Sequence, residues 1–292
     1  MKNSPGKILK YYLDLAKLKI MLPVSFTGFT GYFIFDPHLS VKIILITLGI
    51  LLMSVAASVL NQIQEAGTDS LMDRTKNRPI PSGNITFPEA IIFFFFNLVA
   101  GTAIIFIWGN INAVLVGLFT IFWYNAVYTY SKKITAFAVV PGALTGALPP
   151  LIGWVAAGGG LWDEPIVFIG FLLFTGQIPH FWLLILRYGD EYKKAGFPGI
   201  TDLFSHAQIK RLTFTWVVAS VIAAIFLCYF EIISTVLIIG ILIIASAFLI
   251  MEFTGLLKTQ KEKFNLRKYS IILDLYYLLI LILLIFDRII AS

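Results

Sequence analysis

The chain is short of charged residues and nearly without cysteine, and both shortages exclude classes of protein. Only 13% of its 292 residues are charged, against about a quarter in soluble domains. A single cysteine, Cys228, excludes a disulfide within the chain and a thiol redox pair, and we interpret it as a packing residue. The sequence also lacks a proline-rich or serine-rich linker and a solenoid repeat. We therefore expect one domain, residues 1–292.

Long runs of apolar residues make up most of the chain. The residues are 59% hydrophobic and the mean hydropathy is +0.88, too apolar for a soluble domain of this size. A run of about 20 apolar residues spans a bilayer as a helix. Such runs predict an all-α, polytopic membrane protein whose nine transmembrane helices form a bundle, at 20–36, 41–60, 87–107, 111–130, 136–156, 165–186, 212–230, 232–253 and 269–289.

The basic residues indicate how the chain is oriented in the membrane. One side collects Lys2, Lys7, Lys10, Lys17, Lys19, the 74–78 cluster, Lys132, Lys133, Lys193, Lys194, Lys210, Arg211 and the 258–268 cluster. Only Lys42 and Arg288 fall on the other side. The positive-inside rule then predicts a multi-pass protein of the cell (inner) membrane, with the N-terminus cytoplasmic and the C-terminus outside. Because this scatter explains the net charge of +6, we expect no nucleic-acid partner.

One polar block, after the second run, carries a repeating set of oxygen ligands. Four residues recur at four-residue steps: Asn61, Glu65, Asp69 and Asp73. Residues at this spacing share one face of a helix, and their oxygens suit a hard cation such as Mg²⁺. The cationic Arg74, Lys76 and Arg78 follow at once. The block predicts a clamp for a metal and a diphosphate, with a solvated charged connection as the alternative.

A second polar stretch follows the sixth run. Asp190 and Glu191 supply carboxylates beside two lysines. If the two stretches meet at the cytoplasmic mouth, these carboxylates complete a second metal site, so that two cations share one diphosphate. An ordinary connection of mixed charge is the alternative. Both stretches face the cytoplasm in the predicted topology, so we expect the function to concentrate there.

An ionisable residue, His180, lies inside the sixth apolar run and follows a proline. Such a residue is costly in a membrane and usually faces a cavity. It can ligate a metal or a haem iron, relay a proton or hydrogen-bond a neighbouring helix, and the sequence leaves these open.

Residues between the two polar stretches add further candidates. Lys132 and Lys133, after Tyr128, are markers of topology unless they reach the diphosphate. The glycines between 142 and 153 predict close helix packing. The proline pair at 149–150 predicts a kink or a break in the fifth helix.

These motifs together resemble a known family. Residues 61–83 read NQIQEAGTDSLMDRTKNRPIPSG, which resembles the first aspartate-rich motif of the UbiA-type intramembrane prenyltransferases, in the form found in their haem branch, the protohaem IX farnesyltransferases. Further similar stretches are Tyr128 with Lys132 and Lys133, GALPPLIGW at 146–154, PHFW at 179–182, and Glu191-Tyr192 before Ala195-Gly196. The resemblance covers nearly the whole chain and implies that the nine transmembrane helices surround a central cavity.

The resemblance implies an enzyme that transfers farnesyl from farnesyl diphosphate to a vinyl group of haem B, giving haem O, with Mg²⁺ as cofactor. It implies Mg²⁺ on Asn61, Glu65 and Asp69, diphosphate on Arg74 and Arg78, and a second acidic loop at 190–191. The lipid bilayer is the expected environment. We expect the product to pass to a haem A synthase or to terminal oxidase assembly.

Site residues are predicted for each part of the reaction. The catalytic set is Asn61, Glu65, Asp69 and Arg74. The diphosphate set is Arg74, Lys76, Arg78, Lys132 and Lys133. The metal set is Asn61, Glu65, Asp69, Asp73, Asp190 and Glu191. The acceptor or cavity set is Tyr128, His180, Trp154 and Trp182, in which the tryptophans shield a carbocation or act as interfacial anchors.

Two residues differ from the haem-branch pattern, and these differences leave a second acceptor open. Ala138 stands where that branch often has Asn, and Gly199 where Met is frequent. These favour an aromatic acceptor, such as a hydroxybenzoate or a naphthoate, as the alternative. Asp274, inside the ninth helix, is also unusual, and we expect it to pair within the bundle.

A secondary transporter is the rival from another class. It would place ionisable residues deep in several helices, whereas the acids here gather at one face. The sequence therefore favours the prenyltransferase over the transporter.

Overall fold

A computed structural model describes residues 5–258 and 266–291. Its helices are α1 (Pro5–Ala16), α2 (Leu18–Phe35), α3 (Val41–Asp69), α4 (Phe87–Trp108), α5 (Ile111–Phe122), the π-helix η1 (Trp123–Tyr128), α6 (Thr129–Ile134), α7 (Val139–Ala157), α8 (Glu164–Lys194), the 3₁₀-helix η2 (Ile200–Asp202), α9 (His206–Tyr229), α10 (Val236–Lys258) and α11 (Leu266–Ala291). Nine spans in this part of the chain are long and apolar enough to cross a membrane, with α5, η1 and α6 forming one of them. The predicted all-α fold with nine spans is confirmed.

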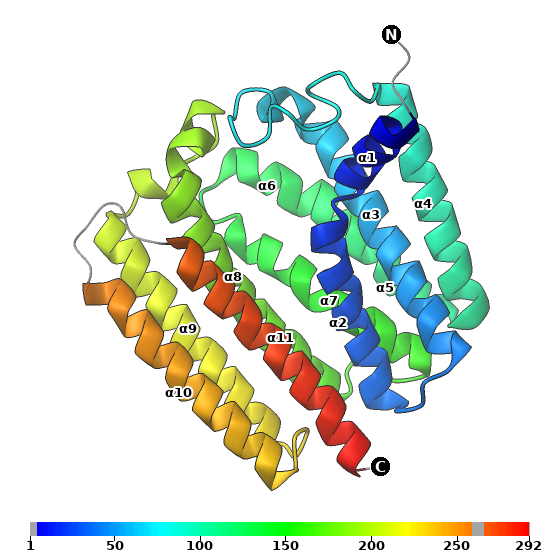
Figure 1. Cartoon of the computed structure of the whole chain (residues 1–292), viewed down its shortest axis with the longest axis vertical. Helices are drawn as coiled ribbons and strands as arrows, with labels where there is room; N and C mark the ends of the chain where they lie inside the picture. The colour runs from blue at the N-terminus through cyan, green and yellow to red at the C-terminus, as the bar shows by residue number, and fades with distance from the viewer. Residues whose placement is uncertain (1–4, 259–265, 292) are drawn as a thin grey trace.

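The polar connections gather at one end of the bundle. Helix α1, the connection 70–86 and the C-terminal end of α8 lie at that end, and the chain's C-terminus lies at the opposite end (Figure 1). Helix α1 and the C-terminus lie at opposite ends because the number of spans between them is odd. Of the basic residues used to predict the orientation, Lys2 and residues 259–265 lie outside the described residues.

Two helices are longer than the apolar runs that predicted them. Helix α3 extends to Asp69 rather than residue 60, and α8 to Lys194 rather than residue 186. The 29 residues of α3 are about 43 Å long at 1.5 Å per residue, more than the ~30 Å hydrocarbon core. Both polar stretches therefore begin as continuations of membrane-spanning helices.

The N-terminal helix α1 was not predicted. It is amphipathic and short, with 12 residues, so it falls below the length of a spanning run. Ile8 and Leu9 are exposed on it, whereas Leu15 is fully buried. Its end is marked by Lys17, whose φ of 47° and ψ of 45° are left-handed. The chain turns there from α1 into the first spanning helix.

Helices α2 and α7 pack backbone against backbone. A Cβ atom added at Gly153 would lie 1.9 Å from the Gly28 carbonyl oxygen, and one at Gly31 would lie 2.0 Å from the Pro150 carbonyl oxygen. The predicted close approach is therefore present. Of the predicted kink or break at the double proline, the break is absent, because α7 is helical from Val139 to Ala157. Protein packed directly against a proline-containing turn is the setting in which membrane helices tolerate it.

The close contact between α2 and α7 predicts that Gly153→Ala destabilises the protein. The added methyl group must push the two backbones apart, and overpacking of this kind costs about 1–3 kcal/mol. The midpoint of thermal unfolding in detergent should fall. Gly240→Ala, in α10, is the matched control, because a Cβ there meets nothing within 4 Å. Equal midpoints for the two variants would contradict the packing described.

Candidate active site

The last turns of α3 carry buried polar side chains. Asn61, Glu65 and Asp69 are 2%, 6% and 1% exposed, respectively. Their spacing places them one turn apart on one face of the helix, as the sequence predicted. Because a buried charge is stable only when it is paired, each acid on this face requires a cation beside it.

Each of these three side chains has a partner, and two of the partners come from α6 and one from the connection after α3. Asn61 Nδ2 donates a hydrogen bond to Thr129 Oγ1 at 3.0 Å. Glu65 Oε1 lies 2.5 Å from Lys132 Nζ. Asp69 Oδ2 accepts a hydrogen bond from Arg78 Nη1 at 2.6 Å. Two buried acid–cation pairs therefore stand side by side at the end of α3.

The π-helix η1 sits directly before the residues that meet α3. Thr129 Oγ1 donates to the Tyr124 carbonyl oxygen, five residues earlier, at 2.9 Å. Gln64 Nε2 donates to the Asn125 carbonyl oxygen at 3.3 Å, which ties the widened turn to α3. Such π-helical turns frequently occur at functional sites. This one comes immediately before α6, which carries Lys132.

The connection after α3 folds back on the helix and also contacts α8. Thr75 Oγ1 donates to the Asp69 carbonyl oxygen at 2.9 Å, so the chain returns toward the site before Arg78. The Arg74 backbone N–H donates to Glu191 Oε2 at 3.0 Å, and the Arg74 guanidinium lies 5.2 Å from the Tyr188 ring centroid. The two polar stretches therefore meet.

Several predicted site residues lie outside the buried cluster. Asp73 is exposed and pairs with Lys76 at 2.5 Å, and this hydrogen bond lowers the pKa of its carboxyl group. Asp190 and Lys133 are also exposed, and Lys133 lies over the Tyr130 ring. In the part of the chain that the structure describes, no three His, Cys, Asp or Glu side chains are grouped to hold a metal ion. The six-residue metal set stays a prediction.

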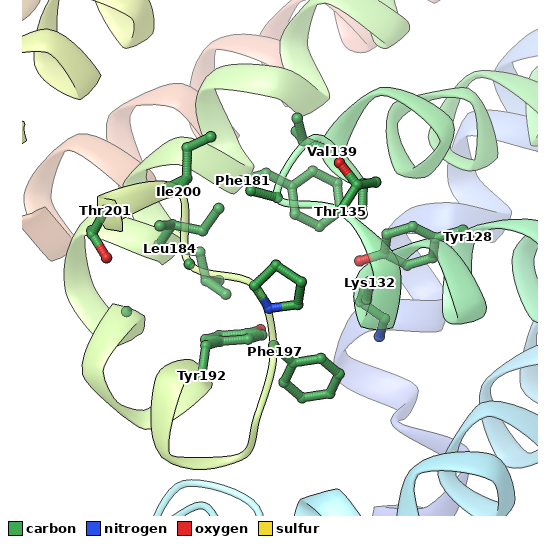
Figure 2. A pocket seen from close by; sticks show the side chains of 16 residues that line it. Tyr128, Lys132, Thr135, Val139, Phe181, Leu184, Tyr192, Phe197, Ile200 and Thr201 are labelled. Atoms are coloured by element: carbon green, nitrogen blue, oxygen red, sulfur yellow. The ribbon is translucent and has the colours of Figure 1, made fainter. Parts of the chain in front are cut away.

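A small cavity of about 60 Å³ adjoins the buried cluster. Figure 2 shows Tyr128 and Lys132 on one side of it and Tyr192 and Phe197 on the other. Its lining includes Ala138 and Gly199, the two positions that depart from the haem-branch pattern. A larger hollow of about 580 Å³ between α5, α7 and α8 is lined by no titratable side chain.

The remaining aromatic and histidine candidates are dispersed. His180 Nδ1 lies 3.1 Å from Asp274 Oδ1, so Asp274 pairs across the bundle from α11 to α8. Trp182 is buried in an apolar cluster with residues such as Ile178 and Ile209. Trp154 does not join the site, since its indole N–H donates to Asp163 Oδ2 at the other end of α7.

Sequence reasoning missed Lys17, which it counted only as a marker of topology. Burial lowers the pKa of its ammonium to about 7, and repulsion by Arg78 adds to this shift. The charges of Asp69, Glu65 and Lys132 also act on this ammonium. In the sequence nothing distinguishes it from the other lysines near the N-terminus.

Comparisons with known proteins agree on one family. The model of the UbiA prenyltransferase family matches residues 24–283. A protoheme IX farnesyltransferase from Cytophaga hutchinsonii is 37% identical over 187 residues, which cover 63% of this chain and 65% of that protein. One from Nitratidesulfovibrio vulgaris (strain DP4) is 33% identical over 211 residues, which cover 72% of this chain and 74% of that protein.

Solved structures share the fold. A digeranylgeranylglyceryl phosphate synthase aligns with a TM-score of 0.77 at 21% identity, covering 97% of this chain and 99% of that chain. A UbiA homolog from Archaeoglobus fulgidus bound to GPP and Mg²⁺ aligns with a TM-score of 0.68 at 18% identity, covering 94% and 99%. At these identities the likeness concerns the arrangement of helices.

The pairing of Glu65 with Lys132 predicts coupled effects of mutation. Lys132→Met leaves a buried carboxylate without a partner, which costs about 3–5 kcal/mol. Adding Glu65→Gln should restore part of this loss, with a coupling energy of about 0.5–3 kcal/mol in a double-mutant cycle measured by unfolding in detergent. Lys133→Met is the matched control and should change little, because Lys133 is exposed. Additive effects of the two substitutions would contradict the ion pair.

Proposed function

Since the chain belongs to the UbiA prenyltransferase family, we propose that it transfers the farnesyl group of farnesyl diphosphate to a vinyl group of haem B, giving haem O. The observation that carries the reaction type is the pair of buried acid–cation contacts, Glu65 with Lys132 and Asp69 with Arg78, beside a cavity. The relatives named protoheme IX farnesyltransferase support the choice of donor and acceptor.

Mg²⁺ is the metal that fits this site. Asn61, Glu65 and Asp69 present amide and carboxylate oxygens on buried, adjacent turns of one helix, which is the donor chemistry that Mg²⁺ takes. We propose these three as its holders. When bound, the ion would polarise the diphosphate oxygens and neutralise their charge. The solved UbiA homolog bound to GPP and Mg²⁺ supports this choice.

The chain's own cations stabilise the leaving group. Arg78 and Lys132 are free to face diphosphate oxygens once the charge of their carboxylate partners is neutralised, and cations placed where charge develops lower the barrier. The bond between farnesyl C1 and oxygen breaks, and its electron pair leaves with the diphosphate. The haem vinyl group supplies the electrons of the new carbon–carbon bond. Water adds to the resulting cation and loses a proton, which gives the hydroxyl group.

Aromatic residues protect the reacting cation. Tyr128 and Phe181 both line the cavity, with ring centroids 5.9 Å apart. Ring faces attract a cation without reacting with it as a charged base would. An apolar cavity also limits the water that could capture the farnesyl cation too early.

The second candidate is prenyl transfer to an aromatic ring, such as that of a hydroxybenzoate or a naphthoate. One observation favours it, which is that Ala138 and Gly199 both line the cavity. Smaller side chains at these positions change the shape offered to the acceptor but leave the diphosphate residues intact. The difference between the two candidates therefore concerns the acceptor alone.

We propose that the enzyme works in the cell (inner) membrane with its active site facing the cytoplasm. The support is the gathering of basic residues at the end of the bundle that holds α1 and both polar connections. A product that stays in the bilayer would pass to a haem A synthase or to terminal oxidase assembly.

The proposal predicts that the purified protein, given Mg²⁺, farnesyl diphosphate and haem B in nanodiscs, forms a farnesylated and hydrated haem. Chromatography with mass spectrometry detects this product directly. An aromatic acid supplied in parallel tests the second candidate. Prenylation of that acid without any new haem would overturn the haem assignment, and no prenylation of either acceptor would overturn the reaction type.

The same assay measures the predicted effect of Asp69→Ala. Turnover should fall by at least about 10²–10³-fold, because both a metal oxygen and the partner of Arg78 are removed. Membrane insertion should be unchanged. Cys228→Ser is the control and should retain activity, since this thiol is a half-buried packing residue away from the site. Full activity of Asp69→Ala would rule out the proposed clamp.

A further inference from the structure

The inner side of helix α1 packs against the end of the bundle that holds the candidate active site. Leu15 is buried in an apolar cluster with Ile80, from the connection after α3, and with residues of α3 and α4. Gln62 Nε2, on α3, donates a hydrogen bond to the Leu15 carbonyl oxygen at 2.6 Å. The Tyr12 ring meets the Phe93 ring of α4 edge to face, with the ring centroids 5.1 Å apart. Helix α1 is therefore held in a fixed position beside α3 and α4.

A second side of α1 is apolar but is not covered by the protein. Ile8, Leu9 and Leu13 are 45%, 60% and 44% exposed, respectively. At 3.6 residues per turn, these three positions fall on one side of the helix. Neighbouring exposed apolar side chains mark a surface that meets a membrane or a partner.

The third side of α1 is polar and basic. Lys7, Lys10 and Asp14 are exposed and lie together on the side of the helix away from Leu9. In the part of the chain that the structure describes, neither lysine forms an ion pair. Residues 5–19 hold four lysines and one acid, so this segment as a whole attracts anions.

The place of α1 in the fold fits a membrane surface. Only Lys17 separates α1 from α2, which is the first membrane-spanning helix, and α1 lies at one end of the bundle (Figure 1). A helix joined directly to the start of a span begins where the hydrocarbon core meets the headgroups. A helix with one apolar side and one lysine-bearing side is typical of helices that lie in the plane of this interface.

We propose that α1 lies in the membrane interface at the active-site end of the bundle, and that Lys7 and Lys10 bind the phosphates of anionic lipids there. Ile8, Leu9 and Leu13 then lie among the upper parts of the acyl chains. A phospholipid offers a phosphate and a hydrocarbon chain side by side, which matches the adjacent basic and apolar sides of α1. A soluble acidic partner would match the lysines but would leave the apolar side in water. The inference does not depend on the reaction or on the acceptor.

The position of α1 is tested with a fluorophore at residue 9 of the full chain, in nanodiscs of phosphatidylcholine and phosphatidylglycerol. Leu9→Cys is labelled in a Cys228→Ser background, so that it holds the only thiol. Lipids with a nitroxide on the upper acyl chain should quench this label, and aqueous acrylamide should quench it weakly. Leu13→Cys provides a second label on the same side. Lys7→Cys is the matched control on the polar side, where acrylamide should quench strongly.

Two results would overturn the interfacial position. One is quenching by acrylamide that is as strong at residues 9 and 13 as at residue 7, which would place the apolar side in water. The other is shielding of residues 9 and 13 from both quenchers, which would show that a protein covers this side.

Headgroup binding is tested with the label at residue 9 and nitroxide-labelled phosphatidylglycerol or phosphatidylcholine at equal mole fraction. The anionic lipid should quench more strongly. A lysine near a charged membrane surface changes affinity by about fivefold, so Lys7→Gln with Lys10→Gln should lower the preference by about tenfold or more. Arg211→Gln with Arg267→Gln is the matched control, because it removes the same charge from exposed positions on α9 and α11, and it should keep the preference. Equal quenching by the two lipids in the protein with both lysines, or a preference that survives their replacement, would overturn the assignment of the lysines.

Discussion

The buried carboxylates at the end of α3 are the constraint on which the rest of the site depends. A carboxylate that is buried without a partner costs several kcal/mol, so Glu65 and Asp69 require cations beside them. Lys132 comes from the fourth span and Arg78 from the connection after α3, and each is held by one of these acids. The fourth span and the connection after α3 are therefore fixed in position by two turns of one helix.

The same pairs explain how a site made of opposite charges can bind an anion. Without a ligand, each cation neutralises a carboxylate. A metal on the carboxylates would release Lys132 and Arg78 toward the diphosphate. The donor and the metal are then expected to bind cooperatively. The metal neutralises the carboxylates, which would repel the diphosphate, and the diphosphate neutralises the cations, which would repel the metal. In the proposed reaction, the cavity beside Tyr128 would limit the access of water to the reacting carbon.

Much of this architecture could be predicted from the sequence, because two of its signals are strong. Hydropathy located the nine spans, and the four-residue spacing placed Asn61, Glu65 and Asp69 on one helical face. Other features depend on tertiary contacts that leave no local signal. Helix α1 is too short for a spanning run, α7 tolerates its prolines because α2 packs against it, and Lys17 resembles any lysine that precedes a membrane helix. Trp154 matched a motif of the family but is held by Asp163 at the far end of α7.

The most direct test of the central claim is an experimental structure of the chain with farnesyl thiodiphosphate and Mg²⁺. The account predicts that the diphosphate lies within hydrogen-bond distance of Arg78 and Lys132, and that both cations have left Asp69 and Glu65. A diphosphate bound elsewhere, with both ion pairs intact, would contradict it.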